Sequence, residues 1–176
     1  MAALDRGLVQ VYTGDAKGKT TASVGLAVRA AGAGLRVAFV QFVKGGDRSS
    51  ELGLLERVGV RVERPAERTT GLLGGGIHDD DRAAADEAWS IAKDALSGDR
   101  YDLVVLDEIN VAMRYGLVET DDVLAVLDAR YPTVEVVLTG RGAPGPIIER
   151  ADLVTEMTLV KHPFDRGIDA RKGIEF

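Results

Sequence analysis

The sequence predicts a single α/β domain in which a mostly parallel β-sheet is flanked by helices. Apolar runs of strand length alternate with segments of helical periodicity along the 176 residues of the chain. This alternation is typical of a parallel sheet, because each new parallel strand needs a crossover connection, usually a helix, to reach the same starting edge. Ligands are then expected where the carboxyl ends of the strands meet.

The first half of the chain contains three expected strands and two expected helices. The strands are expected at residues 8–12, 36–43 and 60–63. Pro65 closes the third strand, because proline cannot donate to a strand ladder. The helices are expected at residues 21–31 and 50–58, and Gly32 and Gly34 are interpreted as the C-cap of the first.

The second half continues the same alternation after a glycine-rich segment, residues 66–78, which we interpret as a mobile loop. Three more strands are expected at residues 101–108, 134–138 and 153–160, and three helices at residues 79–97, 120–130 and 146–150. Thr120 with Asp121 and Asp122 is expected to cap the second of these helices.

Asp79, Asp80 and Asp81 open the helix at residues 79–97. Three adjacent carboxylates suggest a cation site, but they lack the alternating Asp spacing of a calcium loop. Acidic residues in a first helical turn also complement the helix dipole, which is the interpretation we adopt.

Composition narrows the classes of protein to which the chain can belong. An apolar content of 45% and a charged content of 28% are typical of soluble globular chains. The apolar runs are too short to span a bilayer and no signal pattern opens the sequence, so we expect no membrane insertion or export. The chain has no cysteine, which excludes disulfides and thiolate chemistry and fits a cytoplasmic protein. A net charge of −6 argues against broad nucleic-acid binding.

A phosphate-binding loop follows the first expected strand. It comprises Gly14, Asp15, Ala16, Lys17, Gly18, Lys19, Thr20 and Thr21. A strand, a glycine-rich turn, a Lys-Thr pair and a helix form the context of a P-loop, in which backbone N–H groups and the helix N-terminus converge on phosphate oxygens. Lys19 would add a point charge and the Thr20 hydroxyl would ligate Mg²⁺.

The spacing of this loop is unusual. Thr13 occupies the place of the first glycine, Gly14 follows one position later, and Lys17 adds a second cation. A turn that only requires glycine for positive φ would explain Gly14 and Gly18, but not the Lys19–Thr20 pair.

Asp107 and Glu108 form the second half of the expected nucleotide site. They follow four apolar residues, the Walker B pattern in which the acid meets Mg²⁺ directly or through water. An acidic strand end that merely faces solvent is the alternative. The P-loop upstream favours the magnesium role for both carboxylates.

Two further segments follow strands at the same expected edge. Residues 140–145 match a dinucleotide fingerprint, but their prolines suit a rigid loop that presents Arg141 to the ligand. His162 is either an acid/base group or a structural histidine. No side-chain nucleophile with a partnered base is recognisable, so the substrate would supply its own nucleophile or water would be used.

Several blocks together resemble the P-loop ATP:corrinoid adenosyltransferases of the bacterial cobalamin pathway. The blocks are residues 11–21, 40–45, 101–110, 138–144, 151–157 and 160–168. The resemblance covers nearly the whole chain except about residues 46–85. It implies a RecA-like fold, a homodimer, ATP and a reduced corrinoid as substrates, and a reductase as an electron donor.

The resemblance also implies a mechanism. Co(I) of the reduced corrinoid attacks C5′ of ATP and releases triphosphate, so cobalt is the missing nucleophile. Lys19 and Thr20 would hold the triphosphate and Mg²⁺, and the backbone of residues 14–18 would cradle it. Glu108 with Asp107 would complete the metal site, and Lys44 and Arg141 would add positive charge.

Two departures from the family pattern stand out. Family members usually carry a Phe-Thr-Trp stretch in the middle loop that shields the lower face of the corrin, whereas residues 69–78 contain no aromatic side chain. The extension that often helps cover the site is nearly absent before Leu8. The alternatives are a P-loop kinase or NTPase with another acceptor, or a diverged paralogue that binds ATP or a corrinoid without catalysis.

Overall fold

The computed structural model describes residues 4–43, 50–65 and 76–174. Its centre is a six-stranded sheet with the order β3-β2-β4-β5-β1-β6. All the paired strands are parallel, which confirms the expected α/β fold class. The strands are β1 (Val9–Thr13), β2 (Val37–Gln41), β3 (Arg61–Glu63), β4 (Leu103–Asp107), β5 (Glu135–Thr139) and β6 (Leu153–Glu156).

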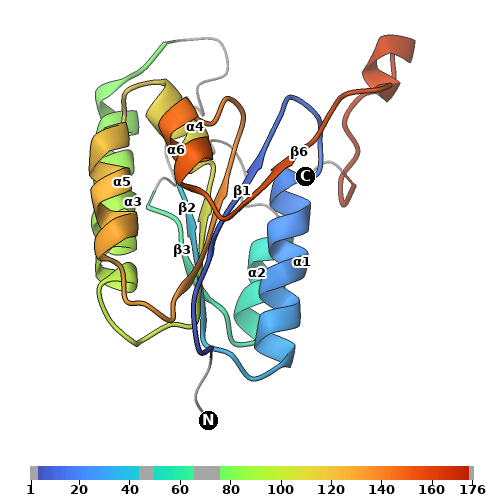
Figure 1. The fold of residues 1–176 in the computed structure, drawn as a ribbon. Helices are drawn as coiled ribbons and strands as arrows, with labels where there is room; N and C mark the ends of the chain where they lie inside the picture. The colour runs from blue at the N-terminus through green and yellow to red at the C-terminus, as the bar shows by residue number, and fades with distance from the viewer. Residues whose placement is uncertain (1–3, 44–49, 66–75, 175–176) are drawn as a thin grey trace.

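Helices cover both faces of this sheet (Figure 1). They are α1 (Lys19–Gly32), α2 (Ser50–Arg57), α3 (Asp79–Leu96), α4 (Ile109–Arg114), α5 (Thr120–Ala129) and α6 (Gly145–Arg150), followed by a 3₁₀ helix, η1 (Pro163–Arg166). Within the described ranges, no helix has both the length and the apolar character needed to cross a membrane.

Alternate residues of the central strands build the two halves of the core. On β4, Leu103 and Val105 pack with apolar residues of α1 and α2, whereas Val104 and Leu106 pack with those of α3, α4, α5 and α6. Successive strand side chains point to opposite faces, so an unbroken apolar run is what a strand covered on both faces needs. The buried pattern of β2 and β4 therefore explains why helices lie on either side.

Several element boundaries differ from the sequence predictions. The helix α4 was not predicted, because it is six residues long and follows β4 after a single residue. Thr120 was predicted to be a cap, but Glu119 is the N-cap of α5 and Thr120 is its first helical residue. Gly32 was also assigned wrongly, since it is the last helical residue of α1 and not part of its cap. Ala33 is the C-cap, and the positive φ of Gly34 (+83°) ends the helix as expected.

The last strand is shorter than predicted, because β6 ends at Glu156. The next residue, Met157, donates its N–H to the Thr13 carbonyl and accepts from Ala16 N–H. The chain therefore leaves the sheet by crossing the loop after β1. The predicted mobile loop at 66–78 falls mainly on residues 66–75, which lie outside the described residues.

Asp81, in the acidic run that opens α3, makes a capping contact that was not predicted from the sequence. Its carboxylate accepts a hydrogen bond from the backbone N–H of His78 at 2.9 Å. A carboxylate at this position satisfies a donor that has no partner within the helix.

Candidate active site

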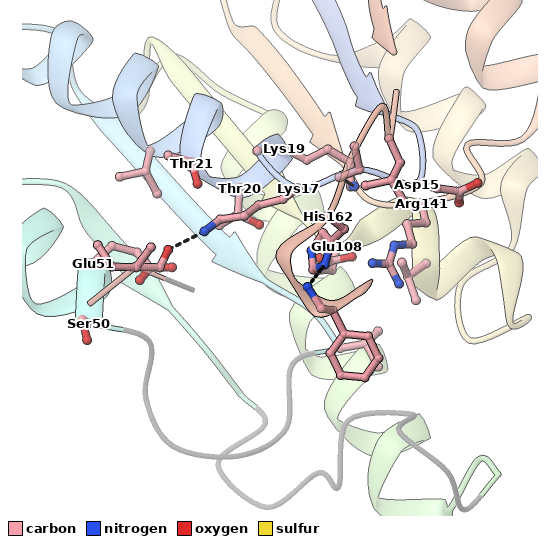
Figure 2. Close-up of a pocket in the computed structure, with 18 of the residues that line it drawn as sticks. Asp15, Lys17, Lys19, Thr20, Thr21, Ser50, Glu51, Glu108, Arg141 and His162 are labelled. Carbon is pink, nitrogen blue, oxygen red and sulfur yellow. Dashed lines mark hydrogen bonds between the residues drawn. The ribbon is translucent and has the colours of Figure 1, made fainter. Parts of the chain in front are cut away.

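A cavity of about 1120 Å³ lies at the carboxyl ends of the strands. Its wall combines the loop after β1 with the start of α1, one side of α2 along its length, α4 and the chain that follows β6 (Figure 2). Seven of the eight predicted loop residues line it: Asp15, Ala16, Lys17, Gly18, Lys19, Thr20 and Thr21. Glu108 and Arg141 also line it, so the structure gathers the two predicted halves of the site.

Gly14 is the predicted loop residue that does not line this cavity, and it lies against the backbone of Met157. Gly14 has a φ of +94°, and a Cβ there would lie 2.4 Å from the Met157 carbonyl oxygen. Ala16 N–H donates to that same oxygen at 3.0 Å. The Ala16 N–H, which the sequence analysis included in the phosphate cradle, is therefore already hydrogen-bonded to the chain after β6.

Gly18 has the second positive φ of the loop, at +122°, immediately before α1. A Cβ at this position would lie 3.0 Å from the Met157 sulfur. The backbone therefore needs glycine at Gly14 and Gly18, for conformation and for close packing. Met157 was not predicted to belong to the site, yet it packs against Gly14 and Gly18 and accepts the Ala16 N–H.

Lys19 is buried at the first position of α1. Its amine donates to the carbonyls of Gly14 at 2.8 Å and of Ala16 at 2.5 Å, and so spans the loop. Burial lowers the pKa of the Lys19 amine, and the charge of Arg141 acts in the same direction, while Glu108 opposes them. A polyanion bound in the cavity would stabilise the charged form of the Lys19 amine and so counteract the lowering of its pKa by burial.

Asp107 is fully buried at the end of β4 and accepts hydrogen bonds from three side chains. Thr20 Oγ1 donates to Asp107 Oδ1 at 2.9 Å, and Thr139 Oγ1 donates to the same oxygen at 2.7 Å. Gln41 Nε2 donates to Asp107 Oδ2 at 2.9 Å. The Asp107 carboxylate is therefore held in one orientation and is tied directly to the predicted magnesium ligand Thr20.

Glu108 connects β4 to α4 with a left-handed backbone. Its φ of 64° makes it the one non-glycine residue with positive φ in the described ranges. Its N–H donates to Thr139 Oγ1 at 3.0 Å. Strain of this kind persists only where the surroundings hold it, and it is common at functional sites.

Gln41 and Thr139 are the polar contacts that sequence reasoning missed. Each is the last residue of a buried strand, β2 and β5, and each is fully buried. A polar residue at the carboxyl end of an apolar strand was the available signal. Its partner was not predictable from the local pattern, because Asp107 lies 66 residues from Gln41 and 32 from Thr139.

Comparison with known proteins identifies the family. Residues 5–176 match the family model described as ATP:corrinoid adenosyltransferase BtuR/CobO/CobP. The chain belongs to this family. It is 42% identical to a corrinoid adenosyltransferase of Pseudomonas aeruginosa, over 98% of this chain and 85% of the relative. It is also 40% identical to a corrinoid adenosyltransferase of Escherichia coli K12 and 39% identical to one of Salmonella typhimurium, in each case over 98% of this chain and 87% of the relative.

Membership of the adenosyltransferase family confirms the resemblance recognised in the sequence. Two predicted features lie outside the described residues: Lys44, and most of the aromatic-free segment 69–78. Lys17, the extra cation of the loop, lines the cavity and donates to the Ile174 carbonyl at 2.6 Å. The end of the described chain therefore reaches the P-loop.

His162 lines the cavity near Glu108 and Arg141 (Figure 2). Its Nδ1 accepts a hydrogen bond from Phe164 N–H at 3.2 Å, and this bond caps η1. This hydrogen bond supports the structural role considered for His162.

The residues present suit a magnesium–nucleotide complex. Within the described ranges, no group of three or more His, Cys, Asp or Glu side chains is placed to hold a metal by itself. Mg²⁺ is commonly held by one or two carboxylates together with phosphates of the substrate. The Thr20 hydroxyl and the Glu108 carboxylate fit this sparse donor set, and the buried Asp107 fits a supporting role through Thr20.

Proposed function

We propose that this adenosyltransferase transfers the 5′-deoxyadenosyl group of ATP to Co(I) of a reduced corrinoid. Cobalt attacks C5′, the cobalt–carbon bond forms, and the C5′–O bond breaks. Its electron pair leaves with inorganic triphosphate. Membership of the corrinoid adenosyltransferase family over residues 5–176 is the observation that carries this proposal.

The charge distribution of the cavity supports a triphosphate leaving group. The whole chain carries a net charge of −6, yet basic side chains slightly outnumber acidic ones in the cavity wall. The basic residues are Lys17, Lys19, Arg57, Arg114 and Arg141. Fixed positive charge beside the departing group stabilises the negative charge that develops in the transition state.

We assign the leaving group to the P-loop. Lys19 would exchange its bonds to the Gly14 and Ala16 carbonyls for phosphate oxygens, as the N-terminus of α1 faces the same space. Because Ala16 N–H is held by Met157, the cradle would rely on the other N–H groups of the loop. Mg²⁺, held by Thr20 and Glu108, would neutralise part of the phosphate charge.

The size of the cavity supports a second substrate beside ATP. About 1120 Å³ exceeds the range of about 300–1,000 Å³ that small-molecule sites usually have. Apolar side chains also line it: Val24, Leu54, Val111, Tyr115 and Leu159. We propose that this apolar part of the wall contacts the corrin ring.

Further features of the proposal come from the family resemblance. We propose that the protein is cytoplasmic, a location that fits the lack of cysteine in the chain. We also propose that it forms a homodimer and that an external reductase supplies Co(I). Lys44 and Arg141 would add charge near the phosphates. The kinase or NTPase alternative has no support from the three named relatives, all of which are corrinoid adenosyltransferases.

The proposal is tested by incubating the protein anaerobically with Mg²⁺–ATP and a chemically reduced corrinoid. The absorbance of the adenosylated product and its loss on photolysis measure the reaction. Lys19→Ala is expected to lower the rate by about 10²–10³-fold, the effect of removing one donor to developing charge. Lys93→Ala is the matched control, because Lys93 lies exposed on α3 and is not part of the cavity wall. Equal rates for wild type and Lys19→Ala would refute the site assignment.

A further inference from the structure

We propose that Thr139 is a positioning residue that couples the two carboxylates of the site, and that its hydroxyl sets the response of ATP binding to magnesium. This inference rests on the proposed function, since it concerns the same metal–triphosphate site. Thr139 is fully buried at the carboxyl end of β5 and is not part of the cavity wall. It therefore acts through Asp107 and Glu108.

The position of β5 in the sheet explains how Thr139 contacts both Asp107 and Glu108. β5 lies between β4, which ends in Asp107, and β1, which leads into the P-loop. Leu106 on β4 pairs with Leu138, and Tyr12 on β1 pairs with Thr139. Thr139 thus stands at the level where the Walker B strand ends and the phosphate loop begins.

The hydroxyl of Thr139 has two partners, one as donor and one as acceptor. It donates its single proton to Asp107 Oδ1 at 2.7 Å and accepts from Glu108 N–H at 3.0 Å. Asp107 Oδ1 is also the acceptor for Thr20 Oγ1 at 2.9 Å. A continuous chain of hydrogen bonds therefore runs from Thr20 through Asp107 and Thr139 to the Glu108 backbone.

The hydrogen bond from Glu108 N–H to Thr139 matters because the backbone of Glu108 is left-handed. A φ of 64° is disfavoured for glutamate, and the Thr139 bond is a side-chain contact that holds its N–H. The next residue, Gly140, leaves room for the Glu108 carboxylate, because a Cβ there would lie only 3.2 Å from Glu108 Oε2. Thr139 therefore holds the backbone of Glu108, while Gly140 makes space for its side chain.

The inference predicts a specific loss when only the hydroxyl is removed. Thr139→Val keeps the shape of the side chain but leaves Glu108 N–H without its partner and Asp107 with one donor fewer. Residues that orient metal ligands typically contribute about 10–100-fold to metal affinity. We expect Thr139→Val to reduce the enhancement of ATP affinity by Mg²⁺ by about 10–100-fold, and Thr139→Ser, which keeps the hydroxyl, to retain that enhancement.

The experiment is titration calorimetry of the full chain with ATP, in Mg²⁺ and in EDTA. The ratio of the two dissociation constants reports the magnesium coupling, and the value in EDTA reports whether the P-loop is intact. Thr155→Val on exposed β6 is the control and should match wild type. If Thr139→Val does not fold, Thr139→Ala is compared with Thr139→Ser instead.

Two results would overturn the inference: a wild-type ratio of one, and a Thr139→Val ratio equal to that of wild type. If the Thr139→Val ratio is unchanged because ATP binding weakens equally with and without Mg²⁺, Thr139 only supports the fold. Absence of adenosylation by wild type would refute the proposed function, while the calorimetric ratios would still decide the role of Thr139.

Discussion

At the scale of single residues, the site depends on backbone conformations that few residue types tolerate. Gly14 and Gly18 take positive φ in the phosphate loop, and both lie against Met157. Glu108 takes positive φ without being glycine, and Thr139 holds it there. Gly14, Gly18 and Glu108 could be identified from motif spacing alone. Met157 and Thr139 could not, because their roles come from contacts between distant parts of the chain.

Gly14→Ala tests the requirement for glycine in the loop. The added Cβ would meet the Met157 carbonyl at 2.4 Å in a backbone conformation that alanine disfavours. We expect a loss of about 1–3 kcal/mol in the free energy of unfolding, together with loss of ATP binding. Denaturant unfolding and calorimetry measure the two effects.

Gly25→Ala is the matched control for that substitution. Gly25 lies inside α1, and a Cβ there would have no neighbour within 4 Å. Because glycine is a poor helix former, this change should raise stability by about 0.5–1 kcal/mol. If Gly14→Ala were as stable as wild type, the close approach of Met157 to the loop would be wrong.

At the scale of elements, the edge of the sheet opposite the cavity is joined by an ion pair between the entries to β2 and β4. Asp102 is buried, and its carboxylate accepts from the Arg36 side chain at 2.7 and 3.1 Å and from Arg36 N–H at 2.7 Å. The side-chain bond from Arg36 is the main reason that the pKa of Asp102 is lowered, and burial opposes it. This contact fixes the two strands that carry Gln41 and Asp107 at their other ends.

Asp102→Asn should lower the free energy of unfolding by about 1–2 kcal/mol, since Arg36 is half exposed and solvent weakens the pair. A lowered folded-state pKa means that the pair contributes fully above the unfolded carboxyl pKa of about 3.9. Its contribution is lost as the pH falls through the lower folded-state value. The difference between wild type and Asp102→Asn should therefore be largest near neutral pH and shrink below about pH 4.

Asp94→Asn provides the comparison at the surface. The Asp94–Arg100 ion pair is exposed on both sides, so its loss should change stability by less than about 0.5 kcal/mol. Chemical denaturation over a range of pH measures all three proteins. A pH-independent difference for Asp102→Asn would contradict the ion-pair account.

Strands and helices were predicted well where the apolar pattern was long. They were predicted poorly where the element was very short or where a contact with a distant part of the chain set its end. The buried runs of β2 and β4 and the periodic α1 and α3 were each predicted near their observed bounds. The six-residue α4 gave no periodic signal. The early end of β6 follows from its contact with the P-loop, and strand propensity carries no information about that contact.

At the scale of the whole molecule, topology assembles the site. The order β2-β4-β5-β1 places Gln41, Asp107, Thr139 and the P-loop on neighbouring strands, although they are separated by tens of residues along the chain. Fold class and family were predictable because they depend on motifs read in order. The hydrogen-bond network was not, because it depends on which strands become neighbours. The homodimer and the single-domain organisation remain predictions.

The central claim is that triphosphate leaves intact when Co(I) attacks ATP. The most direct measurement is ³¹P NMR of the products after reaction of the protein with Mg²⁺–ATP and a chemically reduced corrinoid under anaerobic conditions. We predict inorganic triphosphate in equal amount to the adenosylated corrinoid, and none without the corrinoid. ADP with orthophosphate as the product, in place of triphosphate, would contradict the proposed function.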